Sequence, residues 1–347
     1  MSQRAEEPRK SETVRPGWRT SAPIYAVMLA PLAAALVFGA ILISGAFVDS
    51  DREDKIRRLV ELSTQASTLA HELQKERGMS AGFIASEGAA FGSELSSQRR
   101  LTDKALSQVG AAVTAYPVSD LSAERTALVV ERAQKIKAGI GAIAKIRSQI
   151  DAQTIAKGDA VSFYTGLIRS LLSTADDSLE ANSQADMAKL SLAYSYVLMA
   201  KEFAGVERAV GAAGFGSGAF DKALIRQYRD LQGRQRVLLE RAAHLSDAAG
   251  EARIAGIAKS ADFAAIEALR KVAEDSVGTG DLKGVTGPQW FKTSTAYLGV
   301  LKRVEGAMAA ELIAVSQSAA KASSRVAWIE VASVALIGLF VGLFGFR

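Results

Sequence analysis

The sequence predicts an all-α protein with about eight helices in two antiparallel four-helix bundles, flanked by two transmembrane helices. The first reason is composition: 49% of the 347 residues are hydrophobic but only 7% are aromatic, a balance that suits helices more than sheets. The second is periodicity, because apolar residues between the two hydrophobic ends recur every three or four positions. The third is that the connections are short, which favours antiparallel neighbours.

Composition also narrows the function. The absence of Cys excludes disulfides, thiolate metal sites and Cys nucleophiles. Two isolated histidines, His71 and His244, cannot supply a His-rich metal site. We therefore expect no cofactor, no metal and no enzyme activity. The net charge of +5 is mild and gives no case for a nucleic-acid partner.

Both ends of the chain are strongly apolar. The uncharged stretch from Ile24 to Val48 is long enough to cross roughly 30 Å of hydrocarbon and too long for the apolar core of a cleaved signal peptide. A second, shorter apolar stretch runs from Val331 to Phe346. Either stretch could instead be a buried core helix. The predicted division is a basic cytoplasmic tail (1–22), a membrane helix (23–48), an extracytoplasmic helical domain (49–325) and a second membrane helix (326–346).

This division predicts a protein of the bacterial inner (cytoplasmic) membrane, with both termini in the cytoplasm and the helical domain on the periplasmic side. The basic residues of the N-terminal tail set this orientation. Arg347 directly follows the second apolar stretch. We therefore expect either a piece of a longer receptor or a chain that signals through a partner.

Four helices are expected in the first half of the helical domain. The first, at 49–86, continues from the apolar stretch and ends at Glu87-Gly88. The second starts after a capping Ser93 and stops before Pro117, and the third starts at Ser119 or Asp120. The loop around Gly158 precedes the fourth. The expected ranges of the second to fourth helices are 93–115, 119–151 and 160–181.

The second half is expected to contain four more helices. A glycine-rich run, 214–218, ends the fifth helix. Another glycine-rich loop, 277–287, precedes Pro288, which opens the eighth helix. The eighth helix then continues into the second apolar stretch. The expected ranges of the fifth to seventh helices are 185–212, 220–248 and 251–276.

The first of these helices carries charge where it should be apolar. Its packed face follows a three-four spacing, and Glu76 lies on that face with Arg77 beside it. A charge on a packed face is costly unless it is paired or binds a ligand. The positions of this face are Leu59, Leu62, Ala66, Leu69, Leu73, Glu76, Ser80 and Phe83.

The fifth helix contains a weak echo of this run. Glu207-Arg208 precedes Gly214-Phe215, much as Glu76-Arg77 precedes Gly82-Phe83. Nearby glycines let helix backbones approach and leave room beside a guanidinium. Two facing arginines would repel each other unless an anion lay between them. We expect a cross-helix pair such as Glu76 with Arg208, and the alternative is that all these charges are salt bridges that set helix register.

These residues resemble a known family. The run Lys75-Glu76-Arg77-Gly78, followed by Ser80-Ala81-Gly82-Phe83, closely resembles the hallmark of the nitrate- and nitrite-sensing (NIT) domain. The similarity covers about residues 60–310. Further agreement comes from Gln98-Arg99, Thr102-Asp103, Ser162, Tyr164, Thr165, Lys201-Glu202, Gly205, Glu207-Arg208 and Phe220.

The resemblance implies an all-helical receptor that binds nitrate or nitrite. It assigns binding roles to Arg77 and Arg208, and weaker roles to their neighbours Glu76, Lys75, Gly78, Ser80 and Glu207. A planar guanidinium fork fits a planar anion, but the sequence does not select nitrate over nitrite, chloride or a small carboxylate.

Several receptor types remain open. The family occurs in chemotaxis receptors, histidine kinases, nucleotide cyclases and a soluble antiterminator, and two flanking spans fit a chemotaxis receptor best. We expect a homodimer in contact with membrane lipid and unidentified cytoplasmic signalling partners. The alternatives are the sensor part of a histidine kinase or nucleotide cyclase, or a membrane-anchored structural or adaptor bundle.

Overall fold

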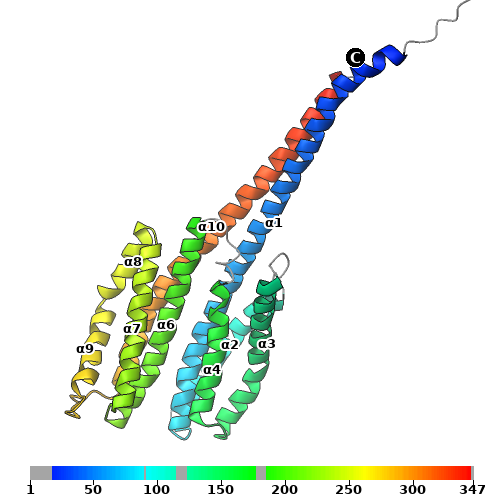
Figure 1. Cartoon of the computed structure of the whole chain (residues 1–347). Coiled ribbons are helices and arrows are strands. Elements are labelled where there is room, and N and C mark those ends of the chain that lie inside the picture. The colour runs from blue at the N-terminus through cyan, green and yellow to red at the C-terminus, as the bar shows by residue number, and fades with distance from the viewer. Residues whose placement is uncertain (1–17, 90, 115–122, 177–184, 345–347) are drawn as a thin grey trace, which may run out of the picture. The chain divides into compact units, whose positions relative to one another are not determined.

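The computed structural model describes residues 18–89, 91–114, 123–176 and 185–344, and in these residues every regular element is a helix (Figure 1). The predicted all-α class is therefore confirmed. The chain divides into two compact units, one of residues 52–320 and one that combines the two ends, 1–51 and 321–347. The helices are α1 (Trp18–Ala85), α2 (Gly92–Thr114), α3 (Ala123–Asp151), α4 (Lys157–Leu172), α6 (Ala185–Ser217), α7 (Lys222–Leu245), α8 (Ala248–Ala258), α9 (Ala261–Asp275) and α10 (Gly287–Phe344).

Local signals place most helix ends correctly. Gly88 has a φ of +84° and its N–H donates to the carbonyl of Phe83 at 2.9 Å, which stops α1 where the sequence predicts. Asp221 caps α7 by accepting hydrogen bonds from the N–H groups of Ala223 and Leu224. The predicted fourth helix, 160–181, is too long, because α4 ends at Leu172 with Ser173 as its cap. The predicted segments 119–122 and 177–181 lie outside the described residues.

One predicted helix end is wrong because the glycines serve packing. α6 does not stop at Gly214 but continues to Ser217, and Gly218, with a φ of +77°, follows it. A Cβ on Gly211 would lie 2.2 Å from the ring of Trp290, and one on Gly214 would lie 2.3 Å from the ring of Phe220. These two glycines admit aromatic rings against the helix backbone.

The predicted helix 251–276 is also wrong, because it is two helices, α8 and α9. The break falls at Lys259-Ser260. The hydroxyl of Ser260 accepts a hydrogen bond from the N–H of Phe263 and caps the new helix. The apolar periodicity continues across this break, which is why the pattern alone did not reveal it.

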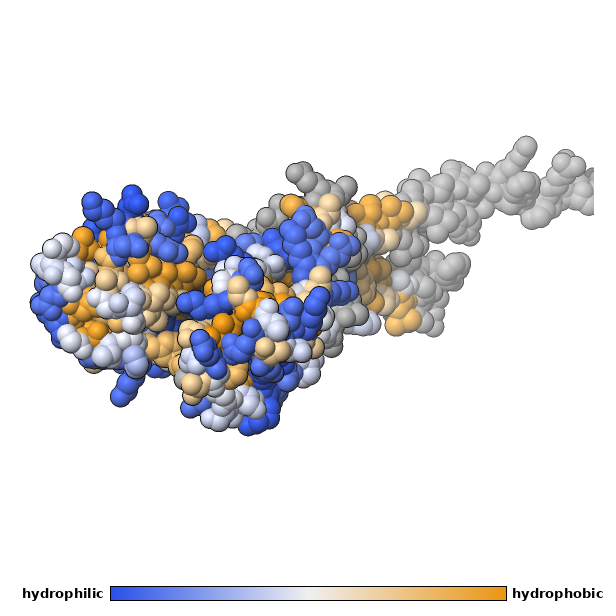
Figure 2. Space-filling model, turned by 90° about the horizontal axis from the view of Figure 1, so that it is seen from below, coloured by the Kyte–Doolittle hydropathy of each residue, from blue (hydrophilic) through white to orange (hydrophobic). Residues whose placement is uncertain are grey.

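The unit of residues 52–320 has a continuous apolar core. The predicted packed face of α1 is buried from Leu59 to Ser80, including the charged Glu76. Neighbouring helices pack as α3 with α4, α6 with α7 and α7 with α8, while α4 also meets α6. Hydrophilic side chains dominate the raised parts of the face in Figure 2, with hydrophobic ones between them. The division into two four-helix bundles stays a prediction.

The unit formed by the two ends is apolar and exposed. Phe38, Ile41, Leu336 and Phe340 have most of their side-chain surface accessible. By length and composition, one helix among the described residues could cross a membrane, within Gly287–Phe340. The predicted first span, 23–48, is helical from Trp18 onward, but several of its side chains lie outside the described residues, as do residues 1–17 of the predicted tail.

Candidate anion-binding site

The two predicted arginines meet where α1 lies against α6. Arg77 and Arg208 are both buried, with 4% and 5% of their surface exposed. Each guanidinium lies beside a glycine of the other helix. A Cβ on Gly78 would lie 3.5 Å from Nη2 of Arg208, and one on Gly205 would lie 3.2 Å from Nη2 of Arg77. The two glycines thus leave space beside each guanidinium.

Arg77 is held by a carboxylate. Its Nη1 donates to Oε1 of Glu202 at 2.7 Å and to the hydroxyl of Thr165 at 2.8 Å, and its Nη2 lies 3.4 Å from Oε2 of Glu202. The amide of Gln74 donates to the same Oε2 at 2.7 Å. Glu202 is fully buried, so its charge is compensated almost entirely by Arg77 and Gln74.

Arg208 has only neutral partners among the described residues. Its Nη1 donates to the hydroxyl of Thr295 at 3.1 Å and its Nη2 to the backbone carbonyl of Gln74 at 3.3 Å. The ring of Phe291 lies 4.8 Å from its Cζ. Burial lowers the pKa of Arg208 to about 10; the charge of Arg77 lowers it as well, and Glu202 opposes both effects. The surroundings therefore disfavour its positive charge.

Glu76 is an ion-pair partner, but not of Arg208 as predicted. It accepts hydrogen bonds from Nε and Nη2 of Arg147 on α3 at 2.7 and 2.9 Å. The hydroxyl of Tyr164 on α4 donates to it at 2.8 Å. The expected Glu76–Arg208 pair is wrong because Glu76 faces α3 and α4, whereas Arg208 faces α1 and α10.

Glu207 repeats this arrangement in the second half of the chain. It accepts hydrogen bonds from Nε of Arg270 on α9 at 2.8 Å and from the amide of Gln235 on α7 at 2.7 Å. Burial alone would lower the pKa of Arg270, but the charge of Glu207 and its hydrogen bonds raise it overall. The two Glu-Arg runs thus resemble each other in structure as well as in sequence, because each Glu binds an arginine from another helix.

The other predicted ligands lie at the edge of the site. The ammonium of Lys75 is 3.3 Å from Glu72 on the same helix, and its side chain is about one-third exposed. Ser80 is buried on the α1 face that also carries Glu76. Gly78 lies directly beside the guanidinium of Arg208. The roles predicted for these residues in ligand binding stay predictions.

A second buried charge cluster lies next to the site. Lys201, adjacent to Glu202, pairs with Glu305 of α10, which also accepts from Ser67 and, at 2.6 Å, from Lys302. Burial alone would raise the pKa of Glu305, but the two lysines lower it to about 2. Burial, together with Lys201, lowers the pKa of His71 to about 2. Within the described residues, no three His, Asp or Glu side chains form a metal site.

Sequence reasoning missed the residues that complete the site. Glu202 and Thr165 belong to the segments that resemble the family, but they received no role. Gln74, Phe291 and Thr295 carried no signal, since the last two come from a helix more than 200 residues away from Arg77 in sequence. The usable signal was Glu202 itself, a carboxylate next to Lys201 between the apolar runs of α6.

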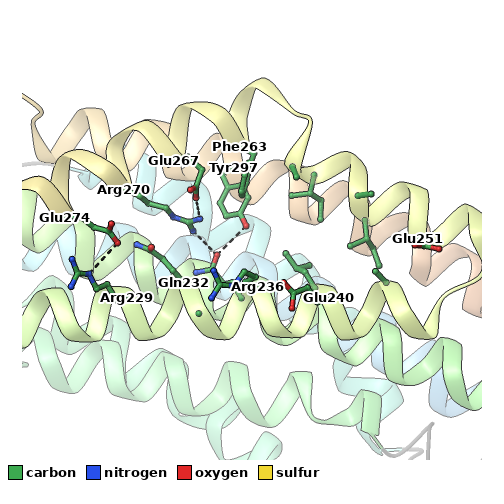
Figure 3. Close-up of a pocket in the computed structure, with 18 residues that line it drawn as sticks. Arg229, Gln232, Arg236, Glu240, Glu251, Phe263, Glu267, Arg270, Glu274 and Tyr297 are labelled. Carbon is green, nitrogen blue, oxygen red and sulfur yellow. Dashed lines mark hydrogen bonds and ion pairs between the residues drawn. The ribbon is translucent and has the colours of Figure 1, made fainter.

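A groove of about 560 Å³ lies elsewhere, between α7, α8 and α9, and Tyr297 of α10 also lines it (Figure 3). Arg270 points from α9 toward its floor and pairs with Glu267 at 2.6 Å, while Arg229 lies 3.5 Å from Glu274 (Figure 3). Arg270 and Arg229 already have carboxylate partners, and Arg236, which also lines the groove, is exposed to water. The groove therefore does not offer a buried uncompensated charge as Arg208 does.

Comparisons with known proteins give a matching family model, a similar protein and a similar solved structure. The family model for nitrate and nitrite sensing matches residues 68–313. The chain is similar to a nitrate regulatory protein of Klebsiella oxytoca, with 29% identity over 252 residues, which cover 73% of this chain and 62% of that protein. Among solved structures, it resembles the NasR transcription antiterminator with a TM-score of 0.68 and 23% identity, over 83% of this chain and 81% of that one. The family match points to a sensor rather than an enzyme, and the likeness to the solved structure shows a shared fold.

Proposed function

We propose that this chain, which belongs to the nitrate- and nitrite-sensing family, binds nitrate or nitrite between Arg77 of α1 and Arg208 of α6. The observation that carries this proposal is the state of Arg208: a buried guanidinium, beside a second guanidinium, with no carboxylate partner among the described residues. A buried cation of this kind is stabilised by an anion.

The chemistry of the site suits a small planar anion. A guanidinium presents parallel N–H groups that match two oxygens of nitrate. Gly78 leaves space beside Arg208, and the ring of Phe291 closes that space on one side. The hydroxyl of Thr165 accepts a hydrogen bond from Arg77 and can turn its own proton toward a bound anion. The hydroxyl of Thr295 accepts from Arg208 and donates to the carbonyl of Phe291, which fixes its orientation beside the site.

The apolar ends support a proposal for the cellular setting. We propose that 23–48 and 326–346 are membrane spans, that 1–22 is a cytoplasmic tail, and that 49–325 is an extracytoplasmic sensor, in two helix bundles, of a homodimeric receptor. The exposed apolar side chains of both ends support this arrangement. A chemotaxis receptor is our leading proposal for the output, ahead of a kinase, a cyclase or an adaptor bundle. The curated relative extends well beyond the matched region, so its whole activity is not carried over.

Ligand titration tests the binding proposal. The full chain in detergent should gain thermal stability with nitrate or nitrite, and the shift should rise with concentration as mass action requires. Arg208→Met should remove the shift, because it keeps the volume but deletes the charge. Arg226→Met, which removes an exposed arginine of α7, should keep it. No shift with any small anion at millimolar concentration would overturn the proposal in favour of a scaffold whose charges only set register.

Membrane fractionation tests the setting. The full chain should remain in the pellet after a carbonate wash that strips peripheral proteins, because two apolar helices hold it in the bilayer. A variant with Leu336 and Phe340 changed to Lys should reduce insertion of the second end. Recovery of the unaltered chain in the supernatant would exclude the receptor proposal without affecting the binding site.

A further inference from the structure

The charges at the crossing of α1 and α6 do not cancel. Two buried guanidinium groups, Arg77 and Arg208, face one buried carboxylate, Glu202. Gln74, Thr165 and Thr295 contribute only neutral groups. The site therefore carries one excess positive charge before any ligand binds.

The neighbouring charges do not change this balance much. Lys201 and Lys302 both contact Glu305, and Lys302 is partly exposed, so water screens the surplus charge of that cluster. Glu76 and Glu207 are each bound by an arginine of another helix, Arg147 and Arg270. The excess at the crossing is thus a local property set by three side chains.

We propose that Glu202 is the residue that restricts the site to monovalent anions, an inference that rests on the proposed function. A monoanion bound beside Arg208 brings the crossing to neutrality. A dianion leaves a buried negative charge, and it meets twice the repulsion from Glu202 that a monoanion does. Burial makes this difference decisive, because water cannot dissipate the residual charge.

Glu202 is the right residue for this role because of its position. Its carboxylate bonds the guanidinium of Arg77 and, through Gln74, shares a partner with Arg208: the side chain of Gln74 donates to Glu202, and its backbone carbonyl accepts from Arg208. The pKa of Arg208 also responds to Glu202, which raises it against the effect of burial. Any anion between the two arginines lies within reach of the field of this carboxylate.

Perchlorate and sulfate separate charge from shape, because both are tetrahedral XO₄ anions of similar size. The experiment is titration calorimetry on the full chain in detergent, at constant ionic strength and neutral pH, with nitrate, perchlorate and sulfate. The wild-type chain should bind nitrate, and it should bind perchlorate at least about tenfold more tightly than sulfate. We call the ratio of the perchlorate affinity to the sulfate affinity the gap. Glu202→Gln should reduce this gap at least about tenfold, because the amide keeps the shape and removes the charge.

Two further variants control the comparison. Asp186→Asn makes the same change of charge at the fully exposed start of α6, about 24 Å along the helix, and should leave the gap unchanged. Glu202→Asp keeps the charge and should keep the preference for the monoanion. Circular dichroism checks that each variant is folded.

The outcomes are distinct. If the wild-type chain binds no nitrate, the proposed function fails. If it binds nitrate but holds perchlorate and sulfate equally, or rejects both, shape explains the selectivity and the role of Glu202 is overturned. An unchanged gap in Glu202→Gln overturns it as well. Should that variant not fold, the wild-type gap and the Glu202→Asp result decide the matter.

Discussion

In the two Glu-Arg pairs of this chain, the glutamates have similar partners and the arginines have different ones. Glu76 and Glu207 are both buried and both bound by an arginine from another helix. Their neighbours diverge: Arg77 forms an ion pair with Glu202, whereas Arg208 has a hydroxyl, a carbonyl and an aromatic ring. The protein satisfies three of these four charges internally, whereas Arg208 has only neutral partners among the described residues.

This difference separates stability from binding. Buried ion pairs that are complete on their own fix how helices meet. Removing one partner destabilises the fold, because the other charge stays buried without compensation. An incomplete site lowers stability until its ligand arrives. The ion pairs of Glu76 and Glu207 support the hypothesis that these two charges set helix register, and our binding proposal rests on Arg208. Four experiments test that separation.

The largest effects should come from breaking the ion pairs of Glu207 and Glu76. Arg270→Ala should lower the free energy of unfolding by about 3–5 kcal/mol, because it leaves Glu207 buried without its cation. Arg147→Ala should cost less, since the side chain of Arg147 is 15% exposed against 8% for Arg270, and water can reach the site. Urea unfolding followed by circular dichroism measures both. Losses below about 0.5 kcal/mol, as for a surface arginine, would mean that these pairs do not hold the fold.

The second test compares the two arginines directly, without nitrate. Arg77→Met should lower the free energy of unfolding by about 3 kcal/mol, since Glu202 then keeps only Gln74. Arg208→Met should not lower it, and should raise it by about 1 kcal/mol, because it removes a buried uncompensated charge. Urea midpoints in nitrate-free buffer give the comparison. Equal losses in both variants would erase the distinction between the two halves.

The pH dependence of folding stability offers a third test, through the buried charge cluster around Glu305 and the neighbouring His71. The folded-state pKa values of Glu305 and His71 are both about 2, against ordinary values of 4.5 and 6.5. Both pKa values are lower in the folded state than in the unfolded state. Each group's contribution to folding stability is therefore fully present above its ordinary pKa and is lost as the pH falls from the ordinary pKa toward the folded-state pKa. Stability should decline below pH 6.5 and more steeply below pH 4.5, by at most about 1.4 kcal/mol per pH unit for each group.

The variant His71→Asn should flatten the first part of that decline, between pH 7 and 5, and leave the second. Urea midpoints across the pH series are the measurement. A decline that starts only below pH 4.5 in the wild-type chain would contradict the role given to His71.

The smallest effects concern the two glycines. A Cβ on Gly205 would lie 3.2 Å from Nη2 of Arg77, which Glu202 holds in place, so Gly205→Ala should lower stability slightly. A Cβ on Gly78 meets Arg208 at an ordinary 3.5 Å, so Gly78→Ala should gain about 0.5–1 kcal/mol of helix propensity. It should also weaken nitrate binding by filling space beside Arg208. Thermal melts with and without nitrate measure both variants.

The sequence predicted well whatever depends on neighbours along the chain. The buried face of α1 and the stop at Gly88 follow from local pattern and local hydrogen bonds. Ion-pair partners could not be predicted in this way, because Arg147 and Arg270 lie 71 and 63 residues from the glutamates they bind. Gly211 of α6 misled for the same reason, because it accommodates the ring of Trp290, which only the folded chain brings there.

Lys201 and Glu202 are adjacent in α6, but they contact different helices. The first contacts α10 through Glu305, and the second contacts α1 through Arg77. The two residues thus contact different helices from consecutive positions of α6. A double-mutant cycle between Glu202 and Glu305 would measure how strongly these two contacts are coupled.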